Sequence, residues 1–181
     1  PFFLYLPLTI PHANNEAKGK GMEVPSLGDY AAKDWPAPQK AHAAMISHMD
    51  RDIGRLFLQL QTLKIEEDTI VFFTSDNGPH KEGGNDPEFN DSNGPLRGIK
   101  RSLHEGGIRV PMIASWPGHI PAGKTSDEPA AFWDLMPTIL HMTGHGDTVP
   151  EGLDGIDLSP TLLGHPEQQS HAYLYWEFPA Y

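Results

Sequence analysis

The residues best suited to chemistry follow a short apolar run in the middle of the chain. Residues 70–73 read IVFF, a β-branched and aromatic run of strand length, and Ser75, Asp76, Asn77 and Gly78 come directly after it. The run predicts a buried strand. Because ligands of open α/β sheets bind beyond the carboxyl ends of the strands, the oxygens of Asp76 and Asn77 are candidates for ligand binding. An ordinary Asx-Gly turn also fits these residues.

A second candidate, His12, follows another predicted strand. Residues 1–8 are apolar and of strand length, and the sequence TIPH at residues 9–12 marks the loop after them. An imidazole at the end of a strand can bind a ligand or transfer a proton. A purely structural, hydrogen-bonded histidine is the alternative, because nothing in the local sequence specifies its partner.

Four basic residues form an island in an acidic half of the chain. Residues 65–181 contain six Lys or Arg and eighteen Asp or Glu, and four of the six basic residues are close in sequence: Arg97, Lys100, Arg101 and Arg109. A small basic island favours a compact anion over nucleic acid, which needs an extended basic face. A solvated loop with paired charges remains the alternative.

The elements that must position these residues follow the order strand, helix, strand. Residues 41–63 have apolar side chains three and four positions apart, which predicts a helix with one buried stripe. With strands at 1–8 and 70–73, this order predicts an α/β fold with a mostly parallel sheet. His42 and His48 are six residues apart on this helix, so we expect both to be surface or satisfied residues.

Further elements are expected in the second half of the chain. Helical spacing predicts a helix over 132–143 that Gly144 ends, and apolar runs predict strands at 110–116 and 173–178. Pro111 indicates that the first of these two strands lies at an edge or that only its later part is paired. Glu105, Gly106 and Gly107 suggest a flexible turn before it.

Composition limits the classes of protein further. The 181 residues include no Cys, and no apolar run reaches the ~20 residues of a bilayer span, so neither a disulfide framework nor a membrane anchor is expected. The chain begins in an apolar run without Met or a basic leader region, which predicts a segment of a longer protein.

Four segments together resemble the formylglycine-dependent (type I) sulfatases of the alkaline-phosphatase superfamily. They are FFLYLPLTIPHA, FTSDNGPH, GPLRGIKRSLHEGGIRVPMIASWPG and the trailing AAFWDLMPTIL with GLDGIDLSPTLLG. The resemblance implies an incomplete alkaline-phosphatase-like fold, a mostly parallel sheet flanked by helices. It implies that residues 1–144 are the C-terminal portion of the catalytic domain, and that 145–181 are a linker and the start of the C-terminal subdomain.

The same resemblance implies roles for individual residues. Asp76 and Asn77 match the pair that coordinates calcium, a cation that prefers hard oxygen ligands. Lys100 matches the lysine that contacts the sulfate group, and His12 the histidine near the ester oxygen, so both are expected to be catalytic and substrate-binding. His80, directly after the metal-binding loop, is a further candidate for substrate contact.

The sequence departs from the family at the nucleophile. Sulfatases form formylglycine from a C/S-x-P-x-R motif, which is absent here, as is the acidic pair near the family's N-terminus. The chain therefore holds one side of the site, with part of a calcium site, and we expect it to be inactive in isolation.

The resemblance implies a parent protein that cleaves a sulfate ester of a carbohydrate or small alcohol. It also implies a periplasmic, secreted or lysosomal location, without nucleic-acid or membrane partners, and leaves the oligomeric state unknown. Two alternatives stay open: a phosphomonoesterase or phosphodiesterase of the same superfamily, and a non-catalytic module that binds sulfated glycans.

Overall fold

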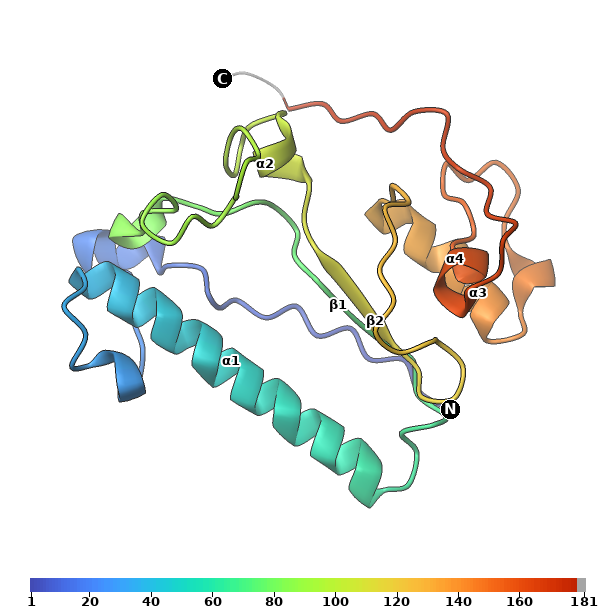
Figure 1. Cartoon of the computed structure of the whole chain (residues 1–181), viewed down its shortest axis with the longest axis horizontal. Coiled ribbons are helices and arrows are strands. Elements are labelled where there is room, and N and C mark those ends of the chain that lie inside the picture. Colours follow the sequence, from blue (N-terminus) through green and yellow to red (C-terminus); the bar gives the residue numbers. More distant parts are fainter. Residues whose placement is uncertain (179–181) are drawn as a thin grey trace. The chain divides into compact units, whose positions relative to one another are not determined.

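The computed structural model describes residues 1–178, without the side chains of residues 18 and 19. It divides into two compact units (Figure 1). The first comprises residues 1–63 and 75–111, and the second comprises 64–74 and 112–178. The helices and strands are α1 (Ala37–Thr62), β1 (Val71–Thr74), α2 (Glu105–Ile108), β2 (Met112–Ser115), α3 (Leu135–Met142) and α4 (Ser159–Leu163). Five short 3-10 helices lie at Asn15–Lys20, Gly28–Tyr30, Glu82–Gly84, Phe132–Asp134 and Gly146–Thr148.

The long helix α1 confirms the predicted helix and begins four residues earlier than predicted. Pro38 lies in its first turn, where the missing N–H costs nothing because that group has no partner inside the helix. Gln39, Ala41, Ala44 and Met45 are buried near its start. The predicted stripe is buried only there, since Leu56 and Leu63 further along are exposed.

The sheet of the second unit is a single pair of antiparallel strands, with Val71 opposite Ser115 and Thr74 opposite Met112. The predicted strand at 70–73 is confirmed as β1, but it is not buried as expected, since Phe73 is exposed. β2 begins immediately after Pro111, so only the later part of the predicted strand at 110–116 is paired. The expected parallel pairing is not seen in residues 1–178. The α/β class itself is confirmed.

Two predicted strands do not form within the described part of the chain. Residues 1–8 and 173–178 have strand-like sequences, yet they make no ladder, and Phe3, Tyr5 and Tyr173 are largely exposed. A strand is defined by its hydrogen-bonded neighbour, so an apolar alternation alone was not sufficient.

The second unit closes around a buried carboxylate. Asp134 precedes α3 and is fully buried, and its oxygens accept hydrogen bonds from the Ala131 and Ile156 N–H groups at 2.7 and 2.9 Å. His171 Nε2 lies 2.9 Å from the same carboxylate. The predicted helix over 132–143 is confirmed as a 3-10 turn followed by α3, and Gly144, at φ 77°, follows its end.

Within residues 1–178, no helix combines the length and the apolar character that a bilayer span needs.

Candidate functional site

Close backbone contacts between glycines fix two loops of the first unit against each other. A Cβ on Gly78 would lie 1.9 Å from the Gly106 carbonyl oxygen, and a Cβ on Gly107 would lie 2.1 Å from the Ser102 carbonyl oxygen. The Gly78 N–H donates to the Gly107 carbonyl at 3.0 Å. Residues 105–107 belong to the helical turn α2, in which Gly106 and Gly107 are buried. The prediction of a flexible turn at these residues is therefore wrong.

A tight turn at residues 99–102 presents Lys100 and Arg101. The Ser102 N–H closes the turn on the Ile99 carbonyl at 2.9 Å, and the Lys100 N–H donates to the Pro79 carbonyl at 3.0 Å. Arg101 has φ 74°, a left-handed conformation that is uncommon outside glycine. The turn thus attaches Lys100 to the loop that follows Asp76 and Asn77.

Lys100 and His12 are in direct contact, 88 residues apart in sequence. Lys100 Nζ lies 2.7 Å from His12 Nε2, and His12 Nδ1 lies 2.7 Å from the Ala13 carbonyl oxygen. Since a carbonyl can only accept, Nδ1 carries the proton, and Nε2 accepts from the ammonium. The structure brings these two predicted residues together.

His80 packs against His12 from the other side. Their rings stack with centroids 5.1 Å apart, and His80 Nε2 lies 3.3 Å from the Pro11 carbonyl oxygen. Burial lowers the pKa of His80, and the nearby charges of His12 and Lys100 lower it further, against the opposing effects of Pro11 and Glu82. His80, predicted as a further candidate for substrate contact, thus lies in one cluster with His12 and Lys100.

His42 belongs to this histidine cluster, so its expected surface or satisfied role is wrong. Its ring meets His80 edge-on at 5.8 Å, and its Nδ1 is buried without a hydrogen-bond partner in the described structure. Burial lowers the pKa of His42, and His80 adds to the effect. The prediction failed because helical spacing shows which face a residue occupies and not what covers that face. His48 is satisfied as expected, 3.0 Å from the Ser26 carbonyl oxygen.

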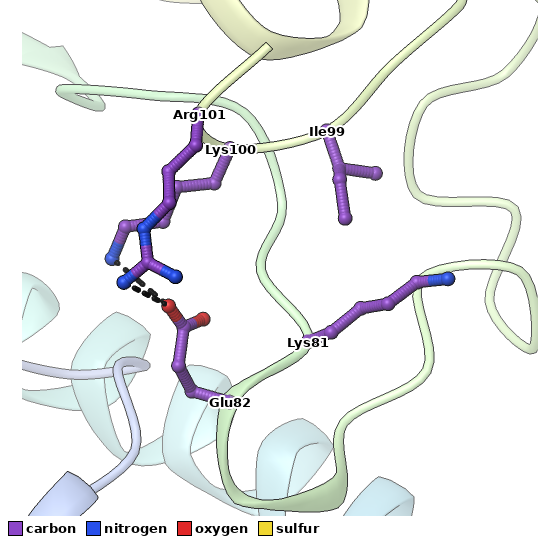
Figure 2. A pocket seen from close by; sticks show the side chains of 5 residues that line it. All are labelled: Lys81, Glu82, Ile99, Lys100 and Arg101. Carbon is purple, nitrogen blue, oxygen red and sulfur yellow. Dashed lines mark ion pairs between the residues drawn. The ribbon is translucent and has the colours of Figure 1, made fainter. Parts of the chain in front are cut away.

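Glu82 is a residue that sequence reasoning missed. Its Oε1 lies 3.2 Å from an Arg101 guanidinium nitrogen and 3.6 Å from Lys100 Nζ, and these side chains converge in Figure 2. Burial acts to raise the pKa of Glu82, but its own backbone N–H and the charges of Lys100, His80 and Arg101 together lower it. The only sequence signal was a carboxylate two residues after His80.

The second oxygen of Glu82 depends on the protonation of His80. Oε2 lies 3.0 Å from His80 Nδ1, while that nitrogen also receives the Glu82 N–H at 3.2 Å. With Nδ1 as an acceptor, neutral His80 has no proton for Oε2, which agrees with the absence of a hydrogen bond at this atom. Only the imidazolium form would donate to it.

Asp76 and Asn77 lie on the same loop as His80. Asp76 is exposed and its carboxylate has no hydrogen-bond or ion-pair partner among residues 1–178, whereas the Asn77 amide donates to the Gly78 carbonyl at 3.0 Å. Both keep a side-chain oxygen for a ligand. Among the described residues, no hydrogen bond or ion pair joins either of them to His12 or Lys100, and no group of three His, Cys, Asp or Glu could hold a metal.

The basic island is divided in the structure. Arg109 pairs with Glu105 at 3.6 Å, whereas Lys100 and Arg101 meet at Glu82 beside a pocket of about 220 Å³. Lys81 and Ile99 complete the lining of this pocket (Figure 2). Its volume is below that of typical small-molecule sites, which suits a compact group.

Comparison with known proteins extends this picture. The family profile described as Sulfatase matches residues 1–145. Rat (Rattus norvegicus) steryl-sulfatase is 37% identical over 150 residues, which are 80% of this chain and 26% of that protein. Dog (Canis lupus familiaris) N-acetylgalactosamine-6-sulfatase is 36% identical over 164 residues, which are 91% of this chain and 29% of that protein.

A solved structure gives the same result. The crystal structure of Ps i-CgsB in complex with k-i-k-neocarrahexaose is 31% identical, with a TM-score of 0.71 over 86% of this chain and 32% of that chain. The chain thus spans between a quarter and a third of the length of these relatives. The profile match covers most of the chain and two relatives cover four fifths or more of it at over 35% identity, so the chain belongs to the sulfatase family.

Proposed function

We propose that the whole protein containing this chain hydrolyses sulfate esters, and that His12 and Lys100 act in the reaction. Family membership supports the reaction class. The observation that carries the assignment of residues is the 2.7 Å contact between Lys100 Nζ and His12 Nε2. It joins a fixed cation to an imidazole at the positions that match the sulfatase motifs.

The geometry suggests one role for each residue. Lys100 offsets charge on the sulfate oxygens, because an ammonium beside a developing anion stabilises it. The Nδ1 proton of His12 is held by Ala13, so Nε2 is the atom that meets the ester oxygen and exchanges a proton with it. His80, stacked on His12, would contact the substrate beside it.

A calcium ion fits part of this site. Asp76 and Asn77 offer a carboxylate and an amide oxygen, which are hard ligands of the kind Ca²⁺ prefers, but this ion takes about six to eight oxygens. The two residues therefore hold one side of the ion. When bound, calcium supplies a positive charge that polarises the sulfate group, and a formylglycine from outside this chain supplies the nucleophile.

The substrate class is a sulfate ester of a carbohydrate or another small alcohol. Of the relatives named above, an N-acetylgalactosamine-6-sulfatase and a protein solved with a neocarrahexaose support a carbohydrate, and a steryl-sulfatase supports another alcohol. A periplasmic, secreted or lysosomal location, the calcium requirement and the division at residue 144 remain predictions from the family resemblance.

Matched ester substrates test this proposal. We expect the whole protein to turn over 4-nitrophenyl sulfate faster than 4-nitrophenyl phosphate, and Lys100→Ala to lower kcat/KM for the sulfate by about a hundredfold or more, as for other groups that stabilise developing charge. Glu105→Gln, at an exposed ion pair of the same unit, is the control. Faster phosphate turnover would favour a phosphoesterase, and binding of sulfated glycan without turnover would favour a binding module.

A further inference from the structure

We propose that Glu82 is a positioning residue that holds Lys100 against His12 and neutralises Arg101 beside it. The inference rests on the proposed function, in which Lys100 and His12 act in the reaction. Its structural basis is independent of that function, since every contact involved lies within the first unit.

The first step concerns where Glu82 lies. Its side chain is only 14% exposed, and three groups surround it: His80 of its own loop at 3.0 Å, and Arg101 and Lys100 of the 99–102 turn at 3.2 and 3.6 Å. A carboxylate with so little access to water is stable only when it is paired. Glu82 and Lys100 are therefore arranged as charge partners.

The second step concerns the two adjacent cations. Consecutive side chains of an extended chain point to opposite faces, yet Lys100 and Arg101 both reach Glu82 (Figure 2). The left-handed φ of Arg101 at the turn makes this possible, and this conformation is unfavourable for arginine. The shared carboxylate offsets that cost and lowers the repulsion between the two charges.

The third step concerns the direction of the Lys100 ammonium. It lies between Glu82 and the His12 Nε2 lone pair, so it is held from two sides. Without the carboxylate, the Lys100 ammonium loses one of its two stabilising partners. The repulsion between Lys100 and Arg101 is then no longer offset by a shared negative charge. Lys100 would then move away from Arg101 into solvent, and His12 Nε2 would lose its donor.

An activity-independent measurement tests the contact. Ring ¹⁵N NMR of histidine-labelled whole protein at pH 7.5 reports both the proton on His12 Nδ1 and the hydrogen bond at the unprotonated Nε2. The Ala13 carbonyl holds the Nδ1 proton in every variant. We expect Nε2 to show the shift of a hydrogen-bonded acceptor in wild type and Glu105→Gln, and the shift of a free lone pair in Glu82→Gln, which keeps the shape and removes the charge. Glu82→Asp keeps the charge and is expected to restore at least part of the wild-type signal.

Kinetics of the same four proteins test the consequence. We expect Glu82→Gln to lower kcat/KM for a sulfate ester by about ten- to a hundredfold, as small misplacements of a catalytic group do, and Glu82→Asp to recover part of the loss. A wild-type Nε2 signal of His12 and wild-type kinetics in a folded Glu82→Gln protein would overturn the proposal. If wild type has no sulfate-ester activity, the proposed function fails, and the NMR result alone decides the role of Glu82.

A second variant covers the case in which Glu82→Gln does not fold. Arg101→Gly suits the left-handed turn and removes the competing cation, so Lys100 should stay on Glu82 and His12 Nε2 should keep the signal of a hydrogen-bonded acceptor. Loss of that Nε2 signal in this variant would show that Arg101, and not Glu82, positions Lys100.

Discussion

At the scale of single residues, the histidine cluster is the most unusual part of the chain. His80 stacks on His12 and meets His42 edge-on, and the three rings come from a loop, a second loop and the helix α1. Two of them have a lowered pKa because burial disfavours the charged ring. The lowered pKa of His42 and His80 favours their neutral forms in this cluster, which leaves nitrogen lone pairs available as acceptors.

This cluster predicts a loss of stability in acid. In the unfolded chain, His42 and His80 titrate near the ordinary histidine pKa of about 6.5. In the folded chain, burial lowers the pKa of both. Stability is thus unaffected above that pH and falls as the pH drops below it, because the unfolded state then binds more protons. We expect the thermal midpoint of the whole protein to fall between pH 7.5 and 5.5, and to fall less in His42→Gln.

Exposed His165 supplies the control for this prediction. His165→Gln should show the same pH dependence as wild type. An equal loss of stability in all three proteins would show that the buried cluster does not contribute.

At the scale of elements, glycines decide how the loops of the site meet. Gly78, Gly106 and Gly107 do not need a left-handed φ; they are needed because backbone passes where a side chain would be. Their packing places the 99–102 turn against the loop of Asp76 and Asn77. Adding a single methyl group at one of these glycines should therefore disturb the arrangement of the site, although the glycines take no part in its chemistry.

Gly78→Ala tests this packing. Its Cβ would lie 1.9 Å from the Gly106 carbonyl oxygen, and we expect it to lower the free energy of unfolding by about 1–3 kcal/mol, as overpacking does. Gly54→Ala in α1 meets no atom within 4 Å and should raise stability by about 0.5–1 kcal/mol. Thermal or denaturant unfolding of the whole protein compares them. Similar effects of the two substitutions would contradict the close-packing argument.

Asp134 plays the corresponding part in the second unit. Its buried carboxylate joins residues 131, 156 and 171, so Asp134→Ala leaves two N–H groups and a histidine without their partner. We expect a loss of about 3–5 kcal/mol, the range for breaking a buried pair. Exposed Asp127→Ala is the control, and a loss of less than about 1 kcal/mol for Asp134→Ala, the range of exposed pairs, would contradict a stabilising role.

At the scale of the whole molecule, the chain corresponds to part of a sulfatase-family protein. It spans between a quarter and a third of the relatives with which it was compared. It contains Lys100, His12 and two oxygen-bearing residues, but no C/S-x-P-x-R motif. The acceptors and cations of the proposed site are therefore separated from the expected nucleophile.

This separation predicts that the 181-residue chain alone is inactive. Without a nucleophile, the remaining groups can bind a sulfate ester but have no atom to attack sulfur. The check is turnover of 4-nitrophenyl sulfate by the purified chain, with the Lys100→Ala chain as the control for contaminating enzyme. Activity that disappears with Lys100 would show that the chain carries its own nucleophile.

The sequence by itself determined the family, the long helix, β1, β2 and the short list of site residues, because motif order and local periodicity are properties of the chain alone. Only the tertiary structure decided that β1 and β2 pair antiparallel, that His42 faces His80, and that Glu82 lies between Lys100 and Arg101. These features depend on which segments meet, and a strand's partner, a buried ring's neighbour and a carboxylate's counter-charges are contributed by residues far away in the sequence.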